Sequence, residues 1–125
     1  MYRVCLSGEE IGTTALESAD PPMGCVSGVI AFCVSTSPYH LFLNHCQLHN
    51  VTVNEIDPEH EFIDTQTIPD LRVFRADGFE ISGIGRCIVG FREGGYEITV
   101  LGIPYPFYAE EFPHHRRAYD ESFKA

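Results

Sequence analysis

The sequence predicts an α+β fold, with a mainly antiparallel sheet, one central helix and a short helical C-terminal tail. Short strand-like segments are separated by turn signals such as Asp77-Gly78 and Gly94-Gly95. Residues 38–49 instead carry apolar side chains at helical spacing. The chain has 125 residues, of which 44% are hydrophobic. This is the usual size of one domain with its own core, so we expect a single domain over residues 1–125.

The N-terminal part of the chain has the pattern of strands broken by turns. Residues 2–7 and 11–17 predict a hairpin that turns at Gly8. Two prolines at positions 21 and 22 end it, because proline has no N–H to donate to a strand ladder. The apolar stretch that follows predicts a buried strand from about Gly28 onward.

The central helix is predicted over residues 38–49. Ser37 is a typical N-cap residue, and Pro38 suits the first helical position. An apolar stripe at positions i, i+3, i+4 and i+7 is expected to pack on the sheet. Its members are Tyr39, Phe42, Leu43 and Cys46.

The second half of the chain is polar at first and then regains a strand pattern. Residues 50–70 are predicted to form a short strand or loop that is exposed and negatively charged. Further strands are expected in an antiparallel meander. Their predicted ranges are 71–75, 79–84, 87–91 and 96–101.

The C-terminal tail is aromatic and charged. Phe112 precedes Pro113, which disfavours one continuous helix and predicts two short helical turns. We expect the large aromatic side chains to be buried in the fold or in a homodimer interface. They are Phe107, Tyr108, Phe112, Tyr119 and Phe123. The residues expected on the solvent side are Glu110, Glu111, Arg116 and Arg117.

The charge balance limits the classes of partner. The chain has eight Lys and Arg residues and 18 Asp and Glu residues, which gives a formal net charge of -10. Such a surface repels phosphates, so we expect binding neither to nucleic acid nor to anionic membranes. It would attract a protein partner with a basic surface, although solubility alone also explains the charge. The acidic residues predicted to bind this partner are Glu55, Asp57, Glu59, Glu61 and Asp64.

The five cysteines are scattered, and no two of them form a C-x-x-C pair. This spacing favours reduced thiols in the core of a cytoplasmic protein over a disulfide framework or a zinc site. The sequence also contains no apolar stretch of the length that a signal peptide or membrane span needs. We therefore expect a cytoplasmic location.

Two histidine groups are candidate chemical sites. His45 and His49 lie four positions apart on the predicted helix, but the ligand set for a metal is incomplete, and Cys46 between them is expected to be buried. The run His114-His115-Arg116-Arg117 would bind a phosphate or carboxylate, or pair with the acidic residues around it, which is the favoured interpretation. We predict no metal site and no cofactor, and we assign no catalytic residue.

Two segments carry a family resemblance. The first contains Leu16-Glu17 and Asp20-Pro21-Pro22-Met23-Gly24, and the second contains Gly102-Ile103-Pro104-Tyr105-Pro106 and Phe112-Pro113. They resemble a family of short, functionally uncharacterised bacterial cytosolic proteins with an "LE-x-x-DPPMG" segment and a "GIPYP…FP" tail. The resemblance implies a bacterial cytosolic protein and transfers no activity to any residue.

Two hypotheses of function follow. In the first, the protein is a small acidic protein-binding module, in its sharpest form an immunity-type inhibitor of a basic toxin or nuclease. In the second, it is a small-ligand or metal-dependent enzyme with a site near His45 and His49, or near residues 114–117. A deep pocket with converging side chains would favour the enzyme, and a flat acidic face would favour the binding module.

Overall fold

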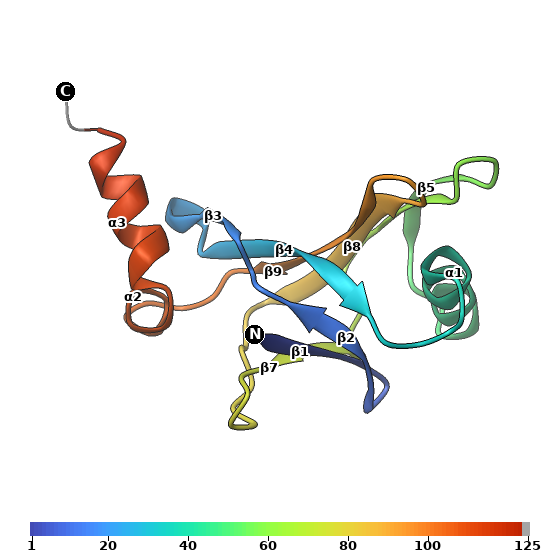
Figure 1. Ribbon diagram of the computed structural model, residues 1–125, viewed down its shortest axis with the longest axis horizontal. Helices are drawn as coiled ribbons and strands as arrows, with labels where there is room; N and C mark the ends of the chain where they lie inside the picture. The colour runs from blue at the N-terminus through green and yellow to red at the C-terminus, as the bar shows by residue number, and fades with distance from the viewer. Residues whose placement is uncertain (124–125) are drawn as a thin grey trace.

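A computed structural model describes residues 1–123 of the chain and confirms the α+β class (Figure 1). Within these residues, nine strands form one antiparallel sheet, accompanied by one main helix and two short C-terminal helices. The elements are β1 (Tyr2–Leu6), β2 (Glu9–Thr14), β3 (Ser18–Asp20), the 3-10 turn η1 (Pro21–Met23), β4 (Cys25–Phe32), α1 (Pro38–Leu48), β5 (Val53–Asp57), β6 (Phe62–Thr65), β7 (Leu71–Phe74), β8 (Gly85–Phe91), β9 (Gly95–Leu101), α2 (Phe107–Glu111) and α3 (Pro113–Glu121). No helix in this described part of the chain has both the length and the apolar character needed to cross a bilayer.

The strand order differs from the meander predicted from the sequence. Along the sheet the order is β5-β6-β8-β9-β4-β2-β1-β7, and β3 pairs separately with β4. The hairpins β1–β2, β5–β6 and β8–β9 are local pairs, as a meander requires. β4, however, lies between β2 and β9, so it joins the two halves of the chain. The N-terminal hairpin and the strands of residues 87–91 and 96–101 are thus confirmed, but their arrangement is not.

Two predicted segments need correction. Residues 50–70 form the hairpin β5–β6 rather than a single exposed strand or loop, and Ile63 and Ile68 in this stretch are completely buried. Ile63 is buried because β6 pairs with β8 and alternate side chains of a strand point to one face. Ile68 lies beyond β6, where its N–H donates to the carbonyl of Arg86 in β8. Residues 79–84 form no strand beyond one isolated bridge from Glu80 to Phe74. The chain leaves the sheet there, with Ile81 turned into the core and Ile84 turned out to solvent.

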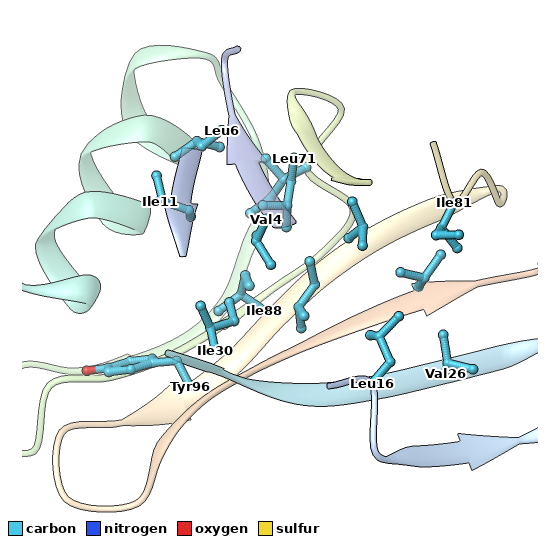
Figure 2. Close-up of a cluster of buried hydrophobic side chains, with 14 of the residues drawn as sticks. Val4, Leu6, Ile11, Leu16, Val26, Ile30, Leu71, Ile81, Ile88 and Tyr96 are labelled. Carbon is cyan, nitrogen blue, oxygen red and sulfur yellow. The ribbon is translucent and has the colours of Figure 1, made fainter. Parts of the chain in front are cut away.

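The core lies on the inner face of the curled sheet (Figure 2). Ten of its members, labelled in the figure, are Val4, Leu6, Ile11, Leu16, Val26, Ile30, Leu71, Ile81, Ile88 and Tyr96. The sheet curls far enough to bring the chain around β7 back to β8. Arg86 Nε donates a hydrogen bond to the carbonyl of Leu71 at 2.6 Å, and the Ile68 N–H donates to the carbonyl of Arg86 at 2.8 Å.

α1 packs its predicted apolar stripe on the protein. Tyr39, Phe42 and Cys46 are buried, and Leu43 is half-buried at the edge of the stripe. Ser37 occupies the N-cap position, but its side chain makes no capping hydrogen bond. The helix start therefore depends on Pro38 and on the packing of the stripe, since the cap contributes no side-chain bond.

The tail forms two short helices that meet at Pro113, as predicted. Tyr108 and Phe112 are buried, and the Tyr108 hydroxyl donates to the carbonyl of Cys25 at 2.9 Å. Phe123, in contrast, is 72% exposed, which contradicts the expectation of burial. It is exposed because α3 extends beyond the end of the sheet (Figure 1).

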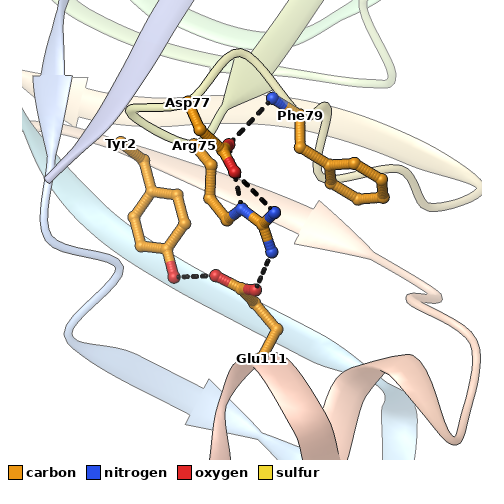
Figure 3. Close-up of polar contacts among 5 residues, drawn as sticks. All are labelled: Tyr2, Arg75, Asp77, Phe79 and Glu111. Atoms are coloured by element: carbon orange, nitrogen blue, oxygen red, sulfur yellow. Dashed lines mark hydrogen bonds and ion pairs between the residues drawn. The ribbon is translucent and has the colours of Figure 1, made fainter.

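Glu111 is not on the solvent side, contrary to the prediction (Figure 3). Its side chain is only 12% exposed. It accepts a hydrogen bond from the Tyr2 hydroxyl at 2.7 Å and another from Arg75 at 2.9 Å. Burial and the neighbouring Glu111 raise the pKa of the Tyr2 hydroxyl above its ordinary value. Glu111 thus connects the tail to β1 and joins segments from opposite ends of the chain.

The hydrogen bonds of Asp77 predict that the folded protein loses stability in acid. Two hydrogen bonds from Arg75 and one from the Phe79 N–H lower the pKa of Asp77 to about 2, from an ordinary value of 3.8. A carboxyl with a lowered pKa in the folded state stabilises the protein above pH 3.8, and this contribution disappears as the pH falls to about 2. We expect Asp77→Asn to lower the melting temperature at pH 6 and to have little effect at pH 2. Thermal unfolding across this pH range measures the difference, and a gap of constant size would contradict the assignment.

Candidate functional site

The predicted acidic residues lie on and beside the hairpin β5–β6, where the structure divides them into two groups. Glu55 on β5 and Asp64 on β6 are partners in the strand register. Within residues 1–123, neither carboxylate belongs to an ion pair. Like charges directly opposite each other on neighbouring strands are destabilising. This pair is therefore an uncompensated negative site on the hairpin.

The other acidic residues of this group are mostly engaged within the protein. Asp57 accepts hydrogen bonds from the Glu59 N–H at 3.1 Å and from His60 Nδ1 at 2.8 Å, and the bond from His60 is the main cause of its lowered pKa. The side chain of Glu61 is 17% exposed and lies 3.7 Å from both His40 and Arg92. Of these three residues, Glu59 alone has no ion pair among residues 1–123, and it is exposed at the turn.

A groove of about 370 Å³ lies between α1 and β5. Its apolar lining includes Leu43 and Cys46 from the helix, Val51 from the connection, and Val53 and Ile56 from the strand. The polar lining consists of Gln47, Asn50, Asn54 and Glu55. The groove therefore places an apolar floor beside one member of the acidic pair.

The strand that borders the groove is at the end of the sheet. β5 pairs with β6 on one side, and no other described strand pairs with its second edge. The register shifts between Val53 and Glu55, so Asn54 forms a bulge in the strand. An edge strand presents backbone N–H and C=O groups that can pair with another extended chain, and bulges and charges limit such pairing. The edge of β5 has both a pairing surface and features that restrict its partners.

A second cluster lies on another face of the C-terminal half of α1. His45 Nε2 is 3.7 Å from a carboxylate oxygen of Asp70, and His49 Nδ1 is 3.9 Å from the same oxygen. The two histidine rings are tilted by 31° relative to each other at a centroid distance of 4.2 Å. The cluster supplies the third ligand atom that the sequence did not reveal, because Asp70 is remote from the helix and shares no spacing pattern with it.

The backbone holds Asp70 in place. Its carbonyl accepts a hydrogen bond from the Ser7 N–H at 3.0 Å, and the adjacent Leu71 is completely buried and donates its N–H to the carbonyl of Ile68. The Asp70 side chain itself is 49% exposed. The backbone of Asp70 is therefore held in place, while its carboxylate is accessible from solvent.

His45 is the buried member of the cluster. Its side chain is 7% exposed, and its Nε2 atom is buried without a hydrogen-bond partner in the described structure. Burial lowers the pKa of His45, His49 lowers it further, and Asp70 opposes both effects. The neutral imidazole that results is the form that binds metal ions.

The remaining candidates do not converge on one site. Cys46 is buried, and burial raises the pKa of its thiol, which makes it a poor nucleophile as expected. In the tail, His115 Nε2 lies 2.7 Å from the carbonyl of Leu16, whereas Arg116 pairs with Asp120 at 3.3 Å. The pairing of this cationic run with a neighbouring acid is thus confirmed for Arg116.

The two segments that carry the family resemblance meet in space. The Ile103 N–H donates to the carbonyl of Gly24 at 2.8 Å, and the Tyr105 hydroxyl donates to the carbonyl of Pro21 at 2.9 Å. Their junction therefore fastens η1 to the chain between β9 and α2. Comparisons with protein-family models, curated proteins and solved structures found no match to this chain.

Proposed function

We propose that this protein is a protein-binding module whose groove between α1 and β5 receives a basic, extended segment of a partner protein. The segment would lie along the second edge of β5 and extend the sheet by one strand. The observation that carries this proposal is the groove that borders an edge strand without a second partner strand among residues 1–123.

Backbone hydrogen bonds would supply much of the affinity. When an extended peptide adds to an exposed sheet edge, main-chain bonds hold it, and pockets for alternate side chains select its sequence. Leu43, Val51 and Ile56 give the groove an apolar surface on which such side chains can pack. The five residues of β5 set the length of the paired segment.

The charge of the site favours a basic segment. Glu55 and Asp64 repel each other across the ladder, and a lysine or arginine beside them would relieve that repulsion. The net charge of -10 would speed the approach of a basic partner at low salt. The same acidic edge disfavours pairing with a second copy of this chain, because identical edges would place carboxylates together.

An immunity-type inhibitor that covers the basic surface of a toxin or nuclease is one protein of this class. A homodimer through the tail stays a prediction. The tail offers less apolar surface for it than expected, since Tyr108 and Phe112 are buried against the protein's own sheet. Light scattering after size exclusion measures that oligomeric state.

We expect a short labelled peptide of alternating lysine and valine to bind at low salt and to dissociate at high salt. The double variant E55Q/D64N should weaken this binding roughly tenfold, because it removes the negative charge of Glu55 in the groove and that of Asp64 on the adjacent strand. Fluorescence anisotropy gives the affinity. Hydrogen exchange should show that the β5 amides that point away from β6 are protected only when the peptide is present.

The matched control is E9Q/E121Q, which removes the same net charge at exposed positions outside the hairpin. It should leave the affinity within about twofold when both double variants are compared at about 0.1 M salt, where exposed charges more than roughly 10 Å apart are largely screened. Equal losses in both double variants would mean that only net charge matters and would contradict the proposed site. Unchanged exchange of the β5 amides would exclude strand addition.

A further inference from the structure

We propose that His45, His49 and Asp70 form a binding site for a divalent transition-metal ion of the zinc class. His45 Nε2, His49 Nδ1 and one carboxylate oxygen of Asp70 would be the ligand atoms. Imidazole nitrogens and a carboxylate oxygen are a ligand set that Zn²⁺ accepts, with other coordination positions left open. The inference is independent of peptide binding at β5.

The spacing of the three atoms supports a shared ion rather than direct hydrogen bonds. The nitrogen-to-oxygen distances of 3.7 and 3.9 Å are too long for a hydrogen bond. Two ligands bound tetrahedrally at about 2.0–2.1 Å from Zn²⁺ lie roughly 3.3 Å apart. The two nitrogen-to-oxygen distances would contract by about 0.4 and 0.6 Å on binding, and all three ligand atoms lie within 4.8 Å of one another.

The unsatisfied nitrogen of His45 is a second, independent observation. A buried polar atom without a partner costs about 1–3 kcal/mol, so native proteins rarely leave one. His45 Nε2 is such an atom, and the oxygen of Asp70 lies on its open side at a distance that a bound ion would bridge. An ion held there would satisfy the nitrogen and the carboxylate together.

The surroundings are favourable for a cation. His49 is the C-cap residue of α1, and the C-terminal end of a helix carries a partial negative charge. The side chains of His49 and Asp70 are 43% and 49% exposed, which leaves a path for the ion from solvent.

Two competing locations for a metal are weaker. Asp57, Glu59 and His60 also lie close together, but the Asp57–His60 pair is already closed by a hydrogen bond of 2.8 Å, and its side chains are largely exposed. Cys46, next to His45, is a buried thiol with a raised pKa, so it does not supply a thiolate.

The test is equilibrium dialysis of the full-length protein, purified without a histidine tag, against Zn²⁺, followed by metal analysis. We expect about one Zn²⁺ per chain and a rise in melting temperature with added Zn²⁺. Asp70→Asn and His49→Ala should each weaken binding at least about tenfold, since even partners of metal ligands cost that much when removed. Both positions are partly exposed, so these variants test the site without relying on a change at buried His45.

The matched control is Asp57→Asn, which removes a carboxylate beside a histidine elsewhere on the surface. It should leave zinc binding unchanged. Cobalt substitution adds a spectroscopic check, because a thiolate-to-cobalt charge-transfer band would assign the ion to cysteine and overturn the proposal. The proposal is also overturned if no zinc is retained, or if D57N weakens binding and D70N does not.

Discussion

Phe112→Ala is expected to lower the free energy of unfolding by about 3–5 kcal/mol. Phe112 is 1% exposed although it lies between the two short tail helices. Its ring contacts the rings of Tyr2 and Tyr108, with centroid distances of 5.9 and 5.5 Å. The substitution would remove a buried ring and leave a cavity between the tail and the first strand. Chemical denaturation monitored by circular dichroism measures the loss.

Phe123→Ala is the matched control, because Phe123 lies in the same tail but is 72% exposed. Its effect should stay within about 0.5 kcal/mol, the usual range for surface substitutions. If both variants lost little stability, the tail would be a detachable segment and not a part of the core. A large loss of stability for Phe123→Ala alone would mean that Phe123 is buried against another molecule and not within its own chain.

Gly24→Ala is also expected to cause a large loss of stability. Gly24 has a φ of +66°, a conformation that costs other residues roughly 1–2 kcal/mol. A Cβ there would lie 2.7 Å from the carbonyl oxygen of Ile103, a backbone atom that cannot move without breaking the junction between the two motif segments. Overpacking adds about 1–3 kcal/mol. Thermal or chemical unfolding measures the combined loss.

Gly8→Ala separates the two contributions. Gly8 also has a positive φ, +82°, but a Cβ at that position would meet no atom within 4 Å. We expect Gly8→Ala to show the conformational cost alone, so the difference between the two variants measures the close contact with Ile103. Equal losses would show that the junction yields readily and does not hold η1 in place.

The elements that depend on local sequence were predictable. α1 follows from an apolar stripe and a proline at its start, and the hairpins β1–β2 and β8–β9 follow from alternation and turn residues. Residues 79–84 have a strand pattern, yet they pair with β7 only over a short stretch, through the bridge from Glu80 to Phe74 and the hydrogen bond from the Ile81 N–H to the carbonyl of Val73. The sequence pattern of a segment indicates its tendency to form a strand, whereas the pairing of that strand depends on its neighbours in the fold.

The candidate sites show the same limit. The sequence indicated His45 and His49 as a pair but gave no signal for Asp70, whose position depends on its backbone bond to Ser7 at the end of the first strand. The acidic residues were visible as a group. Their division into an uncompensated pair, Glu55 and Asp64, and internally bonded members depends on strand register, which a sequence of polar residues specifies weakly.

The position of β4 between β2 and β9 affects how the chain folds during synthesis. After β4 emerges from the ribosome, residues 33–94 must be translated before β9 can cover its edge. At about 5–20 residues per second this takes roughly 3–12 s. Local hairpins form within microseconds, so β1, β2 and β4 have ample time to associate while one edge of β4 is still open. The central pairing of the sheet is therefore among the last to form, and the nascent chain exposes an apolar strand edge for several seconds.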